Sequence, residues 1–68
     1  KDAKSRLQEE AQALGIGLPQ YQVSSNKEGN LFNCRVKFND EIFNASDPIK
    51  KDAEQKVAEL ILHKMGKS

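Results

Sequence analysis

The chain has 68 residues, of which 37% are hydrophobic and 31% charged, and its formal net charge at pH 7 is +1. This composition fits one small globular domain and excludes a disordered tail. No apolar run approaches the roughly 20 residues that span a bilayer, so we expect no membrane-spanning segment and no membrane among its partners. A near-neutral chain creates no global field for a polyanion, so any nucleic-acid site must be a local patch. At this length we expect one domain over 1–68. Because the sequence opens with Lys1 and not with Met or a signal peptide, we expect it to be a fragment of a longer protein.

The first segment predicts an amphipathic helix. Its apolar residues recur at steps of four, four and three, at Ala3, Leu7, Ala11 and Leu14. Gly15 supplies the flexible residue that ends helices, and Pro19 favours extended backbone before it. We therefore expect a first strand over about 20–24, with Tyr21 and Val23 directed toward the core.

Two further strands follow a polar loop over 24–30. The clearest alternation of the chain places apolar side chains at every second position, at Phe32, Cys34, Val36 and Phe38. Asn39 and Asp40 tolerate positive φ, as a two-residue hairpin requires, so a third antiparallel strand is expected over 41–45.

The last segment predicts a second helix that runs to about Met65. Asp47 is expected to cap it and Pro48 to occupy its first position. Its predicted buried stripe consists of Ile49, Ala53, Val57, Leu60 and Ile61. The resulting fold class is α+β, in the order α-β-β-β-α, with a three-stranded antiparallel sheet and two helices packed on one face.

The sequence argues against an enzyme. It contains no metal-ligand cluster, no glycine-rich phosphate loop, and no nucleophile with a suitable histidine and carboxylate. The single cysteine, Cys34, excludes an internal disulfide, favours a reducing intracellular setting, and is expected in the core. We predict no catalytic residue, no metal, no cofactor and no small-molecule substrate.

Several short motifs in order resemble the double-stranded RNA-binding domain family over nearly the whole chain. They are Leu7-Gln8-Glu9 with Gln12, Leu18-Pro19-x-Tyr21, the alternation after Phe32, and Lys50-Lys51-Asp52-Ala53 with Val57-Ala58, which is similar to the family's KKxAKxxAA. The segment 38–43 and Ala58-Glu59 look most like domains of plant proteins that assist Dicer in small-RNA processing.

The resemblance implies three RNA-contacting surfaces, because such a domain spans about 16 base pairs and touches two minor grooves and the phosphates between them. One is the first-helix face of Gln8, Glu9 and Gln12, which could equally be an ordinary solvated face. Another is the loop with Asn26 and Lys27, for which a solvated loop tip is the alternative. The third is the pair Lys50 and Lys51, which would contact phosphates at the start of the second helix.

Two departures from the family pattern predict weak, salt-sensitive binding to double-stranded RNA. The loop is shorter than the family's and lacks its proline and histidine. Position 54, one turn after the lysine pair, is a glutamate where the family has a third lysine. Glu54 is expected to pair with Lys50 or Lys51 and to repel phosphate, and Lys56 projects from the opposite side of the helix.

The resemblance also leaves open a second function, in which the domain binds a protein and contacts RNA little. The expected surface is the edge of the third strand, with Ile42 and with Phe43 if that ring lies on the face away from the helices. Otherwise Phe43 packs against the rim of the sheet. The expected partner is another RNA-binding-domain protein or a Dicer-type enzyme of an RNA-silencing complex, in the nucleus, the cytoplasm or both.

Overall fold

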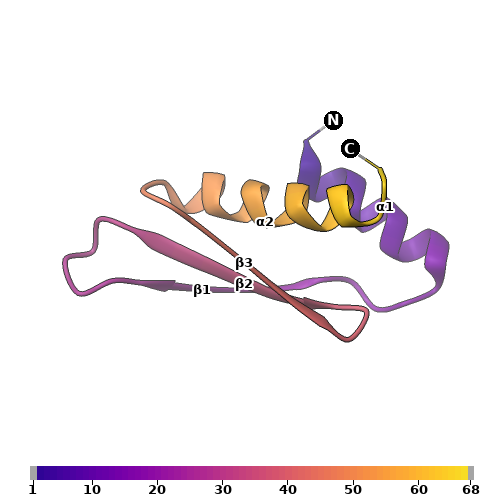
Figure 1. Ribbon diagram of the computed structural model, residues 1–68, viewed down its shortest axis with the longest axis horizontal. Helices are drawn as coiled ribbons and strands as arrows, with labels where there is room; N and C mark the ends of the chain where they lie inside the picture. The colour runs from indigo at the N-terminus through magenta and orange to yellow at the C-terminus, as the bar shows by residue number, and fades with distance from the viewer. Residues whose placement is uncertain (1, 68) are drawn as a thin grey trace.

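The computed structural model describes residues 2–67, and it confirms the predicted α+β order (Figure 1). The two helices lie on one face of a three-stranded antiparallel sheet whose strand order is β1-β2-β3. The elements are α1 (Ala3–Leu14), β1 (Gln20–Ser25), β2 (Phe32–Phe38), β3 (Glu41–Asp47) and α2 (Lys50–Lys64). Within the described residues, neither helix is long and apolar enough to cross a membrane.

The sheet follows the alternation of the sequence. Cys34, Val36 and Phe38 of β2 are buried on the helix side, whereas Arg35 and Lys37 between them are exposed. Asn39 and Asp40 have φ of 52° and 67°, as the two-residue hairpin requires. β3 runs two residues beyond the predicted end, because positions 46 and 47 pair with 33 and 32 of β2.

α1 begins and ends through local contacts that its sequence supplies. The Asp2 carboxylate accepts a hydrogen bond of 2.9 Å from the amide of Ser5, and Gly15 adopts the left-handed conformation that closes the helix. Leu7 and Ala11 are fully buried. Leu14, expected in the same stripe, is instead exposed, because it lies in the last turn at the edge of the helix pair.

The start of α2 differs from the prediction. Asp47 ends β3 and Pro48 precedes the helix, whose N-cap is Ile49 in an extended conformation. Sheet pairing holds Asp47 in the strand, and its carboxylate accepts from the amide of Ile49 at 2.8 Å and pairs with Lys56 at 2.7 Å. Through these contacts Asp47 fixes the turn before α2 and does not cap the helix. The pairing with Lys56 and the hydrogen bond from Ile49 hold the pKa of the Asp47 carboxyl below its usual value.

The buried stripe of α2 is rotated relative to the predicted one. Ile49 and Leu60 are exposed, whereas Ala58 and Leu62 join Ala53, Val57 and Ile61 in the core. The sheet covers one side of α2 and α1 covers another, so the buried face turns toward 58 and 62 and leaves Leu60 in solvent.

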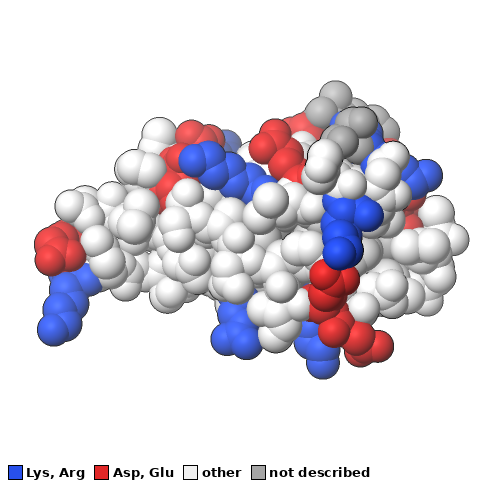
Figure 2. All heavy atoms as spheres, in the orientation of Figure 1, with Lys and Arg blue, Asp and Glu red and all other residues white. Residues whose placement is uncertain are grey.

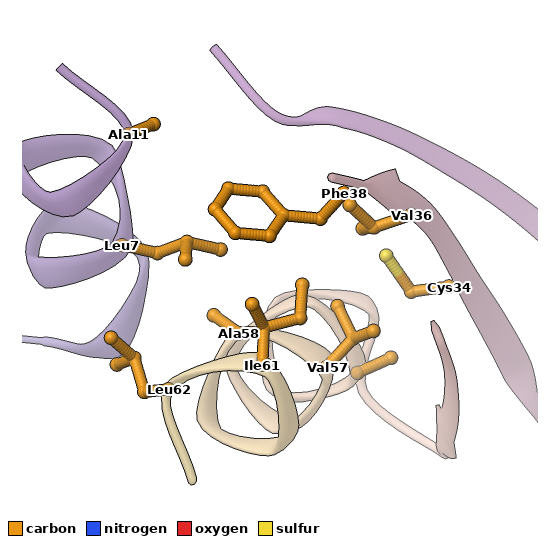
Figure 3. Close-up of a cluster of buried hydrophobic side chains, with 10 residues drawn as sticks. Leu7, Ala11, Cys34, Val36, Phe38, Val57, Ala58, Ile61 and Leu62 are labelled. Carbon is orange, nitrogen blue, oxygen red and sulfur yellow. The ribbon is translucent and has the colours of Figure 1, made fainter. Parts of the chain in front are cut away.

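The core is the space between the two helices and β2 (Figure 3). The Phe38 ring extends from β2 toward α1, with Leu7 across from it, and Val57 and Ile61 of α2 lie below it. Cys34 is fully buried on the same sheet face, as predicted, and burial raises the pKa of its thiol. A cysteine in this state is a packing residue, because the reactive thiolate form is disfavoured.

The rotated stripe can be tested by the same substitution at two positions. Leu62 is 2% exposed and Leu60 is 47% exposed. We expect Leu62→Ala to lower the free energy of unfolding by about 2–5 kcal/mol, and Leu60→Ala to change it by no more than about 0.5 kcal/mol. Urea denaturation of the two variants measures this difference, and equal losses would contradict the observed packing of α2.

Tyr21 of β1 carries a polar atom that the packing leaves without a partner. Its hydroxyl is buried and makes no hydrogen bond with the described residues. Burial raises the pKa of Tyr21 to about 12. Such a hydroxyl has lost its hydration without replacement, which costs folding free energy.

We expect Tyr21→Phe to raise the free energy of unfolding at pH 7 by up to about 1 kcal/mol. Above pH 10 the unfolded tyrosine ionises while the folded one stays neutral until about pH 12, so wild-type stability falls as pH rises through this window. The variant lacks this component, and urea denaturation at pH 7 and at pH 11 separates the two effects. Since Tyr21 is the sole tyrosine of the chain, its absorbance titration reports the pKa directly, and a folded-state value near 10 would refute the assignment.

Candidate nucleic-acid interface

The exposed face of α1 carries the three polar residues that the sequence selected. Gln8, Glu9 and Gln12 are all exposed, while Leu7 and Ala11 anchor the helix in the core. This arrangement presents amide and carboxylate groups to solvent at the flank of the helix pair, where hydrogen bonds to ribose hydroxyls are sterically possible.

The start of α2 presents two cations. Lys50 and Lys51 are exposed, and neither makes an ion pair within residues 2–67. No side chain caps this end of the helix, so the positive end of the helix dipole adds to their charge. Lys56 pairs with Asp47 of β3, which agrees with its expected direction away from the lysine pair.

The sequence predicts that Glu54 pairs with Lys50 or Lys51. In the structure Glu54 pairs instead with Lys4 of α1. The Lys4 Nζ lies 2.7 Å from the Glu54 Oε1, and the two side chains are 36% and 15% exposed. The same ammonium lies 4.8 Å from the centroid of the Tyr21 ring, a cation–π distance. The prediction was wrong because helix spacing ranks only neighbours within α2, whereas packing brings α1 alongside.

Gln55, the next residue of α2, holds the first turn of α1. Its Oε1 accepts hydrogen bonds from the amides of Ala3 at 2.9 Å and Lys4 at 3.4 Å, two groups that have no partner inside their own helix. Sequence reasoning missed the contacts that Lys4 makes with Tyr21, Glu54 and Gln55, since no local pattern links residues that lie on different elements.

The two helices thereby bring two of the three predicted surfaces together. Gln8 of α1 and Lys51 of α2 line one depression, together with Lys4, Tyr21 and Glu54. Asp2, Ser5 and Gln55 also line the depression, so it combines two ammonium groups with two carboxylates and two side-chain amides.

The β1–β2 loop forms one tip of the molecule, beyond the start of α2 (Figure 1), and none of its residues lines this depression. The Asn26 side chain closes the loop: its Oδ1 accepts from the amides of Asn30 and Leu31, and its Nδ2 donates to the Asn30 side chain at 2.7 Å. Of the two residues predicted to contact RNA here, Asn26 is thus committed to the loop, and Lys27 is exposed at the tip.

The charged side chains of the visible face are mixed in sign. Figure 2 shows basic and acidic groups beside each other, including one of each at the loop tip, and no extended patch of one sign. This distribution agrees with the expectation that any polyanion site is local. Within the described residues, no group of three or more metal-ligating side chains lies together.

The edge strand β3 carries the two residues predicted for protein contact, on opposite faces. Ile42 is 47% exposed on the face away from the helices. Phe43 pairs with the buried Val36 and packs against the core, so it is not an outward anchor. The alternative reading of Phe43, as a residue at the rim of the core, is the one that the structure supports.

Comparisons with known proteins agree with this geometry. Residues 3–65 match the family model described as "Double-stranded RNA binding motif". A solved structure from Arabidopsis, titled "Structure of Arabidopsis HYL1 and its molecular implications for miRNA processing", is 31% identical and superimposes with a TM-score of 0.81, over 94% of this chain and 96% of that one.

A search of curated protein sequences found no match. The resemblance to plant small-RNA-processing domains is nevertheless confirmed by the Arabidopsis structure. With the family model covering nearly every described residue, the chain belongs to the double-stranded RNA binding motif family, whose members are non-catalytic RNA-binding domains.

Proposed function

We propose that this domain binds double-stranded RNA weakly, by shape and not by sequence, as part of small-RNA processing inside the cell. The observation that carries the proposal is the pair of exposed lysines, Lys50 and Lys51, which make no ion pair within residues 2–67 and stand at a helix start that no side chain caps. Lys51 shares a depression with the exposed Gln8. Lysines at such a site suit phosphates, and Gln8 with Glu9 and Gln12 suits the ribose hydroxyls of a minor groove. The Arabidopsis relative, whose title concerns miRNA processing, supports the biological setting.

Weak binding follows from what the other surfaces lack. Glu54 occupies the place of a third cation and neutralises Lys4. In the loop, Asn26 is engaged with Asn30 and Leu31, which leaves Lys27 as the exposed contact. With about two phosphate contacts, the logarithm of affinity should fall with the logarithm of salt at a slope near −1.8.

A titration of a 20-base-pair duplex, as RNA and as DNA of the same sequence at low salt, tests this function, because about 16 base pairs are needed for both minor grooves. We expect saturable binding to RNA, weaker binding to DNA, and loss of binding as salt rises. Indifference to both duplexes, or equal affinity for both, would contradict the proposal.

Lys51→Ala should weaken binding to the RNA duplex and reduce the salt slope by about 0.9, the share of one phosphate contact. Lys64→Ala is the matched control, since it removes the same charge from the last turn of the same helix. Fluorescence anisotropy at several salt concentrations measures both quantities. Equal effects of the two substitutions would mean that net charge, and not the start of α2, governs affinity.

A second candidate function, binding of a protein partner at β3, is favoured by the exposed Ile42 on an edge strand. An edge strand offers unpaired backbone groups to another chain, and an apolar side chain beside it adds buried area. The partner would be another RNA-binding-domain protein, including a second copy, or a Dicer-type processing enzyme.

If β3 binds a second copy, sedimentation velocity over a wide concentration range should show association that Ile42→Lys abolishes. Leu14→Lys, which changes an exposed leucine at the end of α1, should leave association intact. A domain that stays monomeric throughout, and that retains no processing enzyme when immobilised, would remove the support for this candidate.

A further inference from the structure

The family pattern has a third lysine at position 54, where this chain has a glutamate. The ammonium group of Lys4 lies beside the side chain at that position. Position 54 follows Lys50 by four residues and Lys51 by three, so its side chain lies on the same side of α2 as theirs. The Lys4 Nζ is only 2.7 Å from the end of that side chain. A positive charge is therefore present at this place, but α1 supplies it and Glu54 neutralises it.

Lys4 is held in this position from three directions. Gln55 binds the backbone amide of Lys4, the Tyr21 ring lies 4.8 Å below its ammonium, and Glu54 pairs with it. Removal of the Glu54 charge would leave the Tyr21 ring and the backbone contact of Gln55 in place, and the Asp2 carboxylate, which lines the same depression, would remain near Lys4. The Lys4 side chain is 36% exposed and the Glu54 side chain 15%, so Lys4 is the more accessible member of the pair.

We propose that Lys4 is a further RNA-contacting residue, which binds a phosphate of the duplex in the depression shared with Gln8 and Lys51, and that Glu54 competes with this phosphate for the Lys4 ammonium. The inference rests on the proposed RNA-binding function and deepens it. A phosphate that meets Lys51 lies within the same depression as Lys4, and binding both requires that the Lys4–Glu54 pair be broken or shared.

The competition is energetically feasible because a partly exposed ion pair contributes little net stability. Phosphate is an equally good partner for an ammonium group. The cost that remains is the Glu54 charge itself, which lies beside the bound phosphate. Glu54→Gln removes this charge and keeps an oxygen that can accept from Lys4, so the α1–α2 contact should survive.

Four proteins test the inference: wild type, Glu54→Gln, Lys4→Gln and the double variant, each titrated with a 20-base-pair RNA duplex over a range of salt. We expect Glu54→Gln to tighten binding about tenfold, as couplings between contacting residues allow, and to steepen the salt slope by about 0.9. In the Lys4→Gln background the same change should give little gain. Lys4→Arg with Glu54→Gln should restore the gain, which separates the cation from the packing of the stem.

Glu59→Gln is the control for net charge, because it removes a carboxylate from an exposed position of α2 outside the depression. An equal gain from Glu54→Gln with and without Lys4 would overturn the inference, since Glu54 would then act only by repelling phosphate from Lys50 and Lys51. A gain as large from Glu59→Gln would also overturn it. If none of the proteins binds the duplex, the proposed function fails and the role of Lys4 fails with it.

Discussion

The docking of α1 onto the first turns of α2 is the contact on which the candidate RNA surface depends. Gln8 and Lys51 lie on different helices, and a reader of duplex shape needs a fixed spacing between such groups. Leu7 packs into the core beside α2, and Gln55 accepts hydrogen bonds from the first amides of α1. The first turns of α2, which would bind phosphate, therefore also hold α1 and so fix the position of Gln8.

This double use explains what the glutamate at position 54 contributes and what it costs. A lysine there would add a phosphate contact but would face Lys4 at short range, and two ammonium groups so close repel each other. Glu54 relieves this repulsion and links the helices, at the cost of one cation for RNA. Glu54 acts as one member of an ion pair with Lys4. Under the proposed function, its effect on RNA affinity depends on the residue at position 4.

Local patterns predicted the sheet and its hairpin because the sheet has one buried face and side chains alternate along a strand. A shift of the strand pairing by one residue would expose the apolar side chains, so a single register is favoured. On α2 they predicted Ala53, Val57 and Ile61 correctly but were wrong about Ile49 and Leu60, because a helix covered by two partners buries a wider face than a single stripe. The alternatives Leu60 and Leu62 are equally apolar, and only the position of α1 decides between them. The Lys4–Glu54 pair was invisible for the same reason, since it joins residues 50 positions apart.

Several of the described cations are paired with carboxylates or lie on the sheet face away from the helices. Four described lysines are engaged in ion pairs with acidic side chains, at Lys4, Lys56, Lys64 and Lys67. Arg35 and Lys37 lie on the sheet face away from the helices, so they cannot join Lys50 and Lys51 on one duplex groove. If the isolated domain makes only the two proposed phosphate contacts, linkage to a second RNA-binding module would raise affinity by about 10²–10⁴ without any new contact. In such a tandem protein a weak module would set the spacing and orientation on the duplex, and its partner would supply most of the affinity.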